Sequence, residues 1–231
     1  MFTSAMFYKT ESVEHSGYRW RTLLRSLAVL MVALVGLTGC DYESRAIGNS
    51  NPTRVAEVKQ SLRDLWVGHI FWVRNVVSNN ATNNLDERDA AEKQVLAHSK
   101  HIAHTMKQFY GDAISDTLCR LLNSHYSAIR EYSEATVVGN KSRQEAALAL
   151  LESNAGELAD LLSSVNPYLQ KDTIHGVIVA NGAHHIQQIN LYKEKKYTHL
   201  MRTWGMMRKQ VYVMADALTE GLVRQFPDQF S

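Results

Sequence analysis

The feature of this sequence that most restricts its fold is an apolar repeat at spacings of three and four residues, from Val55 to Leu222. Side chains at these spacings share one face of an α-helix, so the repeat predicts amphipathic helices. Alternating runs of β-branched residues, which would indicate strands, do not occur in the sequence. We therefore expect an all-α protein.

Short polar segments interrupt the repeat and mark the expected helix ends: residues 79–84, 111–112, 139–140, 166–167 and 194–195. Connections this short force neighbouring helices to run in opposite directions. Residues 53–231 are therefore expected to form an antiparallel up-down bundle of about six helices, with a four-helix core. Asp86, Ser142 and Asp172 are the expected N-caps of three of these helices.

The N-terminal forty residues have the organisation of an export signal. Three arginines precede an apolar run at residues 27–37, which is shorter than the ~20 residues of a permanent membrane span. The run ends in Leu37-Thr38-Gly39-Cys40, which resembles the lipobox of bacterial lipoproteins. The resemblance implies that residues 1–40 are a signal peptide and that Cys40 becomes diacylated. Residues 41–52 are polar and turn-forming, as expected of a flexible tether.

The same resemblance implies a location and a partner. The lipid on Cys40 would anchor the protein to a membrane of the bacterial cell envelope, with the bundle outside the cytoplasm. Asp41 resembles the signal that retains enterobacterial lipoproteins at the inner membrane. The outer face of the inner membrane and the outer membrane both stay open as destinations.

Charge and motifs exclude several classes of function. The first forty residues hold four of the 25 basic and two of the 23 acidic side chains, so residues 41–231 carry 21 of each. This balance excludes the basic footprint of a nucleic-acid-binding protein. With Cys40 lipidated, Cys119 stands alone and no internal disulfide is expected. Known enzyme motifs are absent from the sequence, so it indicates no catalytic activity and names no protein partner.

Three predicted helices each carry a histidine within the apolar repeat: His69, His98 and His125. In an antiparallel hairpin, residues equidistant from the turn lie at the same height, and the predicted turns place these three histidines level. Other residues are expected at that height or within about one turn of it: His101, Ala155, Asn181, His185 and Arg208.

A buried imidazole without a hydrogen-bond partner costs roughly 1 to 3 kcal/mol, so three at one height need partners, water or a ligand. One interpretation is that the three histidines are ordinary core residues of a structural or partner-binding protein without a ligand. A second is a transition-metal site for Zn, Cu or Fe, because neutral imidazole suits these ions. Its ligands would be His69, His98 and His125, with His101 and His185 as further candidates.

The third interpretation is a pocket for a small anion or organic ligand, held by Asn181 and Arg208 together with the imidazoles. A ferritin-like di-iron site is not expected, because the sequence contains no Glu-x-x-His motif. The sequence as a whole thus predicts a membrane-anchored binding module with a histidine-rich site in the bundle core.

Several segments together resemble a family of exported bacterial helical proteins without assigned activity: residues 65–75, 109–111, 166–167, 214–218 and 225–227. The likeness covers most of residues 60–230. It implies polar residues at positions 69, 98, 101 and 125, and further histidines near Asn181 and Arg208. This chain departs from the family at those last two positions, which weakens the case for a shared metal site.

Overall fold

The computed structural model describes residues 50–231, so the predicted signal peptide, Cys40 and most of the tether lie outside this part of the chain. The first described helix, α2 (Pro52–Ala81), begins with proline, whose fixed φ suits a first turn. The Asn51 side chain caps it by accepting hydrogen bonds from the backbone N–H groups of Thr53 (3.0 Å) and Arg54 (3.4 Å).

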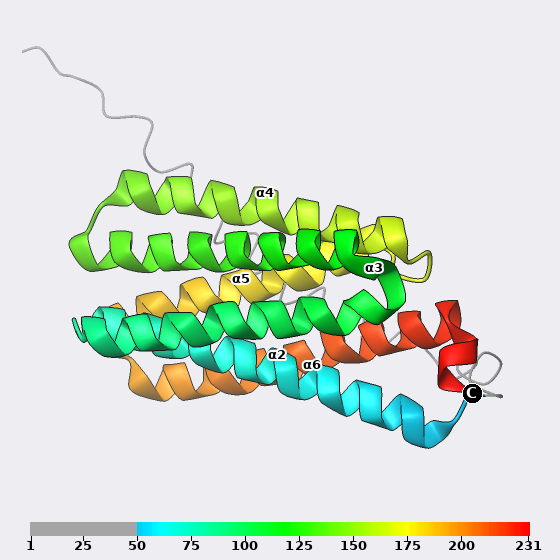
Figure 1. Ribbon diagram of the computed structural model, residues 1–231. Helices are drawn as coiled ribbons and strands as arrows, with labels where there is room; N and C mark the ends of the chain where they lie inside the picture. Colours follow the sequence, from blue (N-terminus) through cyan, green and yellow to red (C-terminus); the bar gives the residue numbers. More distant parts are fainter. Residues whose placement is uncertain (1–49) are drawn as a thin grey trace, which may run out of the picture. The chain divides into compact units, whose positions relative to one another are not determined.

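The second helix, α3 (Leu85–Val138), folds back on itself at Gly111 to form two arms (Figure 1). Gly111 has φ 78° and ψ 179°, a conformation that is essentially restricted to glycine. Ion pairs join the two arms at positions equidistant from Gly111: Arg130 with Glu92 (2.8 Å) and Arg88 with Glu134 (3.9 Å). The two arms therefore run antiparallel about this residue.

Three further helices and a short 3₁₀ turn complete the chain: α4 (Lys141–Val165), α5 (Lys171–Lys193), α6 (Tyr197–Gln225) and η1 (Pro227–Phe230). Each helix packs against the next along the sequence, and α6 also packs against α2. The helices thus surround a common interior (Figure 1).

The predicted N-caps are wrong by two residues. The cap positions of α3, α4 and α5 are occupied by Asn84, Asn140 and Gln170. At α4, the Asn140 side chain accepts a hydrogen bond from the backbone N–H of Arg143 at 3.1 Å. Asn140, a residue of the preceding turn, therefore caps α4 in place of the predicted Ser142.

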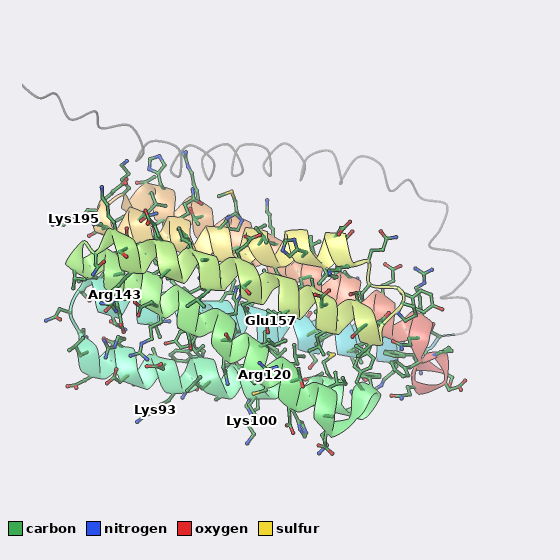
Figure 2. The ribbon with its side chains drawn as sticks, turned by 90° about the horizontal axis from the view of Figure 1, so that it is seen from above. Lys93, Lys100, Arg120, Arg143, Glu157 and Lys195 are labelled. Carbon is green, nitrogen blue, oxygen red and sulfur yellow. The ribbon has the colours of Figure 1, made fainter. Side chains whose placement is uncertain are left out.

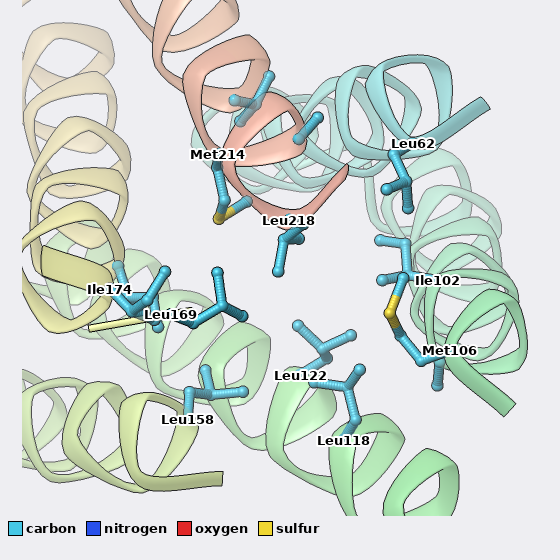
Figure 3. Packing of buried hydrophobic residues seen from close by; sticks show 14 of the residues in the cluster. Leu62, Ile102, Met106, Leu118, Leu122, Leu158, Leu169, Ile174, Met214 and Leu218 are labelled. Carbon is cyan, nitrogen blue, oxygen red and sulfur yellow. The ribbon is translucent and has the colours of Figure 1, made fainter. Parts of the chain in front are cut away.

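All five helices contribute apolar side chains to one large core cluster, and their labelled members point toward a common centre in Figure 3. One end of the bundle is closed by Phe230, which is fully buried and stacks on Phe109 with ring centroids 5.9 Å apart. The backbone N–H of Asn51 donates to the Phe230 carbonyl at 2.6 Å. The start of α2 and the C-terminus are therefore joined at this end.

The all-α bundle predicted from the sequence is confirmed for residues 50–231. The structure has five helices there, slightly fewer than the six expected, because α3 covers two of the predicted helical segments. The backbone between these segments is non-helical at Gly111, where the break at residues 111–112 was predicted. Within the same described range, no helix combines the length and apolarity needed to cross a bilayer.

Candidate functional site

His125, on the second arm of α3, has the most completely defined hydrogen bonding of the buried histidines. Its Nδ1 lies 2.9 Å from Oδ1 of Asn154 on α4, and Nδ2 of Asn154 donates to the Leu121 carbonyl at 3.1 Å. Because a carbonyl only accepts, this second bond turns the amide oxygen toward the imidazole, and Nδ1 of His125 must carry the proton. Its Nε2 is then a bare lone pair, buried without a partner among the described residues.

His69, on α2, is 7% exposed and repeats this arrangement with the opposite ring nitrogen. The imidazole donates to the backbone carbonyl of Val95, while Nδ1 is buried and has no partner in residues 50–231. Burial lowers the pKa of His69 to about 3, helped by the nearby imidazoles of His125 and His98 and opposed by the Val95 bond. For His125, burial lowers the pKa to about 4 against the opposing bond to Asn154. Both rings are therefore neutral at pH 7.

His98, on the first arm of α3, lies against the backbone of Gly68. A Cβ atom at position 68 would stand 2.9 Å from Nδ1 of His98 and closer still to Cε1, so glycine makes room for this ring. The imidazole donates to the Leu65 carbonyl, and its buried Nδ1 has no partner in the described chain. His101 meets His98 edge-on at 6.2 Å between centroids, but it faces solvent.

His185, on α5, is the most deeply buried of the four, with 1% of its surface exposed. Its Nδ1 has no hydrogen-bond partner among the described residues. Burial lowers its pKa well below the usual value, and the imidazoles of His125, His69 and His184 add to the effect. One turn later, both amide atoms of the fully buried Gln188 also lack partners in this part of the chain.

These four residues, His69, His98, His125 and His185, are called the histidine layer below. His125 disfavours protonation of both His69 and His185, His69 disfavours protonation of His185, and His98 disfavours protonation of His69. The four rings are therefore connected by electrostatic interactions. As they stand, no three or more His, Cys, Asp or Glu side chains of residues 50–231 are arranged so that they could hold a metal ion.

A cavity adjoins the layer and is lined by residues from all five helices. Its volume is about 40 Å³, where one water molecule needs roughly 10 to 15 Å³ on the same measure. Most lining side chains are apolar, and the polar ones are Trp66, His125 and Asn181. The indole N–H of Trp66 and Nε2 of His125 are both buried without partners in the described structure. The surface that these residues present to the cavity is nonetheless almost entirely apolar.

The structure brings together some of the residues predicted at one height and separates others. Asn181 lies on the cavity with His125, and Ala155 is buried beside the Asn154 that holds His125. Arg208 does not reach the layer: it is exposed on α6 and bonds to the Tyr212 hydroxyl at 3.3 Å. The fully buried neighbour Met207 faces inward in its place.

Asn154, Gln188 and the indole of Trp66 were not predicted from the sequence to belong to the site. Asn154 had a detectable signal, because it lies three residues after Leu151 and four before Leu158, on the edge of the apolar repeat. Comparisons with protein-family models, with curated proteins and with solved structures give no match. The function must therefore be inferred from the chemistry of the site itself.

Proposed function

We propose that this protein is a lipid-anchored binding module of the bacterial cell envelope whose histidine layer binds one transition-metal ion, with Zn, Cu and Fe as candidates. The anchor is supported by the lipobox-like segment that ends at Cys40 and by the polar residues that follow it. Loss of palmitate incorporation in a Cys40→Ser variant tests the anchor. Catalysis is not part of the proposal.

One observation carries the metal proposal: four imidazoles present a buried ring nitrogen without a partner in the described chain. In three of them, His69, His98 and His125, the other nitrogen donates to a backbone carbonyl or an amide oxygen. Metal-binding histidines are held in this way, because the second bond fixes the tautomer and orients the lone pair. The lowered pKa values also remove proton competition at pH 7.

The expected ligands are the mutually close His69, His125 and His185, with His98 as a fourth. His101, which the sequence also suggested, points to solvent and is not included. Zinc–imidazole bonds are about 2.0 to 2.1 Å long. Because the rings do not converge as they stand, binding must be accompanied by a movement of helices or side chains that brings the free nitrogens to one ion.

Equilibrium dialysis of the untagged, chelator-treated protein against Zn²⁺ or Cu²⁺ tests the proposal. We expect about one ion per chain for the wild type and loss of most of it in His125→Ala and His185→Ala. The matched controls are His104→Ala and His199→Ala, which change exposed imidazoles and should retain the ion. Circular dichroism verifies that each variant is folded. Equal binding by core and surface variants would reject the site.

The cavity supports a second candidate, a small uncharged organic ligand. The cavity surface is almost entirely apolar and suits the hydrocarbon part of such a ligand. The unpartnered Nε2 of His125 and indole N–H of Trp66 belong to lining residues, and a hydroxyl group that reached them would satisfy both. A small anion is not favoured, because no cationic side chain lines the cavity in residues 50–231. Stabilisation by a short-chain alcohol without metal, lost in Trp66→Phe, would favour this candidate.

A further inference from the structure

The balanced charge of the chain conceals an uneven distribution. Residues 193–213 contain six basic side chains and one acidic one, Glu194. Glu194 is already paired with Lys196 at 2.7 Å, and Lys193 donates to the Thr136 carbonyl at 3.1 Å. The remaining four basic residues are all exposed: Lys195, Arg202, Arg208 and Lys209. This segment therefore presents a positive surface.

The helices that pack against the first half of α6 provide no acidic side chains there to neutralise its positive charge. Residues 65–85, from α2 and the turn after it, contain no Asp or Glu, and neither do residues 173–193 of α5. Arg74 of α2 adds a further positive charge and stacks over the Trp204 ring of α6 at 5.4 Å. The acid-free character thus extends over three adjacent helical segments.

The same surface exposes large apolar side chains. Tyr197, Met201, Met206 and Val213 of α6 are between 45% and 61% exposed. The apolar residues of α6 are interspersed with the basic ones along the helix, so the helix exposes both kinds of side chain over the same length. We call this set of exposed basic and apolar residues, together with Arg74 and Trp204, the α6 face.

We propose that the α6 face lies on an anionic membrane surface. Basic side chains attract acidic headgroups, while exposed Met, Val and aromatic side chains enter the interface between headgroups and acyl chains. The inference rests on charge complementarity and exposure, and it is independent of metal binding. A lipid tether, where present, raises the local concentration of the face at the membrane.

The position of the face determines how the bundle would lie. The start of α2 and the C-terminus meet at one end, through the Asn51–Phe230 bond, whereas α6 begins at the opposite end. From residue 197 to residue 213, α6 extends about 24 Å along the bundle, at roughly 1.5 Å per residue. A protein held near Asn51 that also engages the α6 face must lie with its long axis along the membrane.

Fluorescence quenching in vesicles tests the proposal on the full chain. Met206 on the α6 face, or Leu150 on α4 as the matched control, is replaced by a fluorescent amino acid; both are exposed hydrophobic positions. The vesicles contain nitroxide-labelled phosphatidylcholine, with or without phosphatidylglycerol. We expect strong quenching at position 206 only with phosphatidylglycerol, weakening at high salt because screening reduces the attraction, and little quenching at position 150.

A charge-reversed pair provides the second comparison. Arg202→Glu with Lys209→Glu should reduce quenching at position 206 by roughly half or more, since each basic residue contributes to headgroup attraction. Lys93→Glu with Lys100→Glu, on the first arm of α3 and pointing away from Lys195 in Figure 2, should leave it unchanged. Equal quenching at positions 206 and 150, or no dependence on phosphatidylglycerol, would overturn the proposal. The α6 face would then be a candidate binding surface for an acidic protein.

Discussion

At the scale of single residues, the tightest constraint in the histidine layer is the fit of the His98 ring against Gly68. A Cβ atom at this position would clash with the ring, whereas a Cβ at Gly156 on α4 would meet no atom within 4 Å. Both glycines lie within helices, where alanine is intrinsically favoured by about 1 kcal/mol. The two positions therefore separate steric fit from helix propensity.

Gly68→Ala should lower the free energy of unfolding by about 1 to 3 kcal/mol, because the His98 ring must leave its hydrogen bond to Leu65. In a His98→Ala background the same change should be neutral or stabilising. Urea denaturation of the four proteins of this cycle measures the coupling. Gly156→Ala is the control and should stabilise. Equal effects of Gly68→Ala in both backgrounds would show that the ring does not occupy this position.

Arg208 and Met207 show that counting residues from the turns predicts the level of a residue along the bundle but not the direction of its side chain. Counting residues from the turns predicted the level of the layer on α6, and the inward residue is the neighbour of the one predicted. Adjacent helical residues differ in direction by about 100°, so an error of one residue turns an inward side chain outward. The same counting worked for His69, His98 and His125, whose places within the apolar repeat also fixed their direction.

At the scale of elements, the turn at Gly111 shapes the bundle, because it allows the two arms of α3 to run antiparallel. Gly139, which ends α3, also has positive φ, but its φ of 72° and ψ of 21° lie in the left-handed helical region. Asparagine visits that region readily, whereas the conformation of Gly111 is essentially closed to it. The same substitution should therefore have different consequences at the two glycines.

Gly111→Asn should destabilise the protein by about 1 to 3 kcal/mol, and Gly139→Asn by less than about 1 kcal/mol. Neither change introduces a steric clash, since a Cβ at either position meets nothing within 4 Å. Chemical denaturation provides the comparison. A similar loss at both positions would contradict the account of the turn.

The sequence predicted the helical elements well because glycine, asparagine or proline marks every turn between them except the last, where residues 193–196 are charged. The ends were less predictable. The cap positions of α3, α4 and α5 lie two residues before those expected, and only Asn140 of α4 makes a side-chain cap hydrogen bond. Helix ends are the least certain part of a prediction from sequence, because several residues near a turn can occupy the cap position. The break at Gly111, by contrast, lies where the sequence predicted it, because glycine is the residue that adopts its non-helical conformation.

At the scale of the whole molecule, the buried imidazoles predict how stability depends on pH. An exposed imidazole has a pKa of 6.5, whereas the folded values are about 4 for His125 and about 3 for His69, and His185 is also lowered. Above pH 6.5 these imidazoles are neutral in both the folded and the unfolded protein, so their protonation does not reduce the free energy of unfolding. As the pH falls below 6.5, the unfolded chain takes up protons that the folded chain excludes, so stability is lost.

Each such imidazole should reduce the free energy of unfolding by up to about 1.4 kcal/mol per pH unit between roughly pH 6 and 4.5. Glu131 and Glu194, whose pKa values are lowered by Arg143 and Lys196, act in the same direction but only below pH 4.5. Urea denaturation across this range measures the slope, and His125→Gln should reduce it by about one proton. A constant stability from pH 7.5 to 5 would contradict the burial of neutral imidazoles.

The composition predicted a net charge of zero for residues 41–231 and gave no indication of the positively charged α6 face. Net charge is a sum and does not record position, so an acid-free surface formed by α2, α5 and α6 becomes visible only when the helices are placed side by side. The histidine layer differs in this respect, because all four of its members lie at the spacing of an apolar repeat and were candidates from the sequence. The bond between His125 and Asn154, and the complete burial of Gln188, became visible only from the packing of the helices.

Anomalous X-ray diffraction at the zinc edge, from crystals of the untagged protein grown with Zn²⁺, tests the central claim most directly. The account predicts one strong peak inside the bundle, about 2.0 to 2.1 Å from a ring nitrogen of His69, His125 and His185. Peaks only at exposed imidazoles such as His101, His104 or His199, with the layer empty, would contradict it.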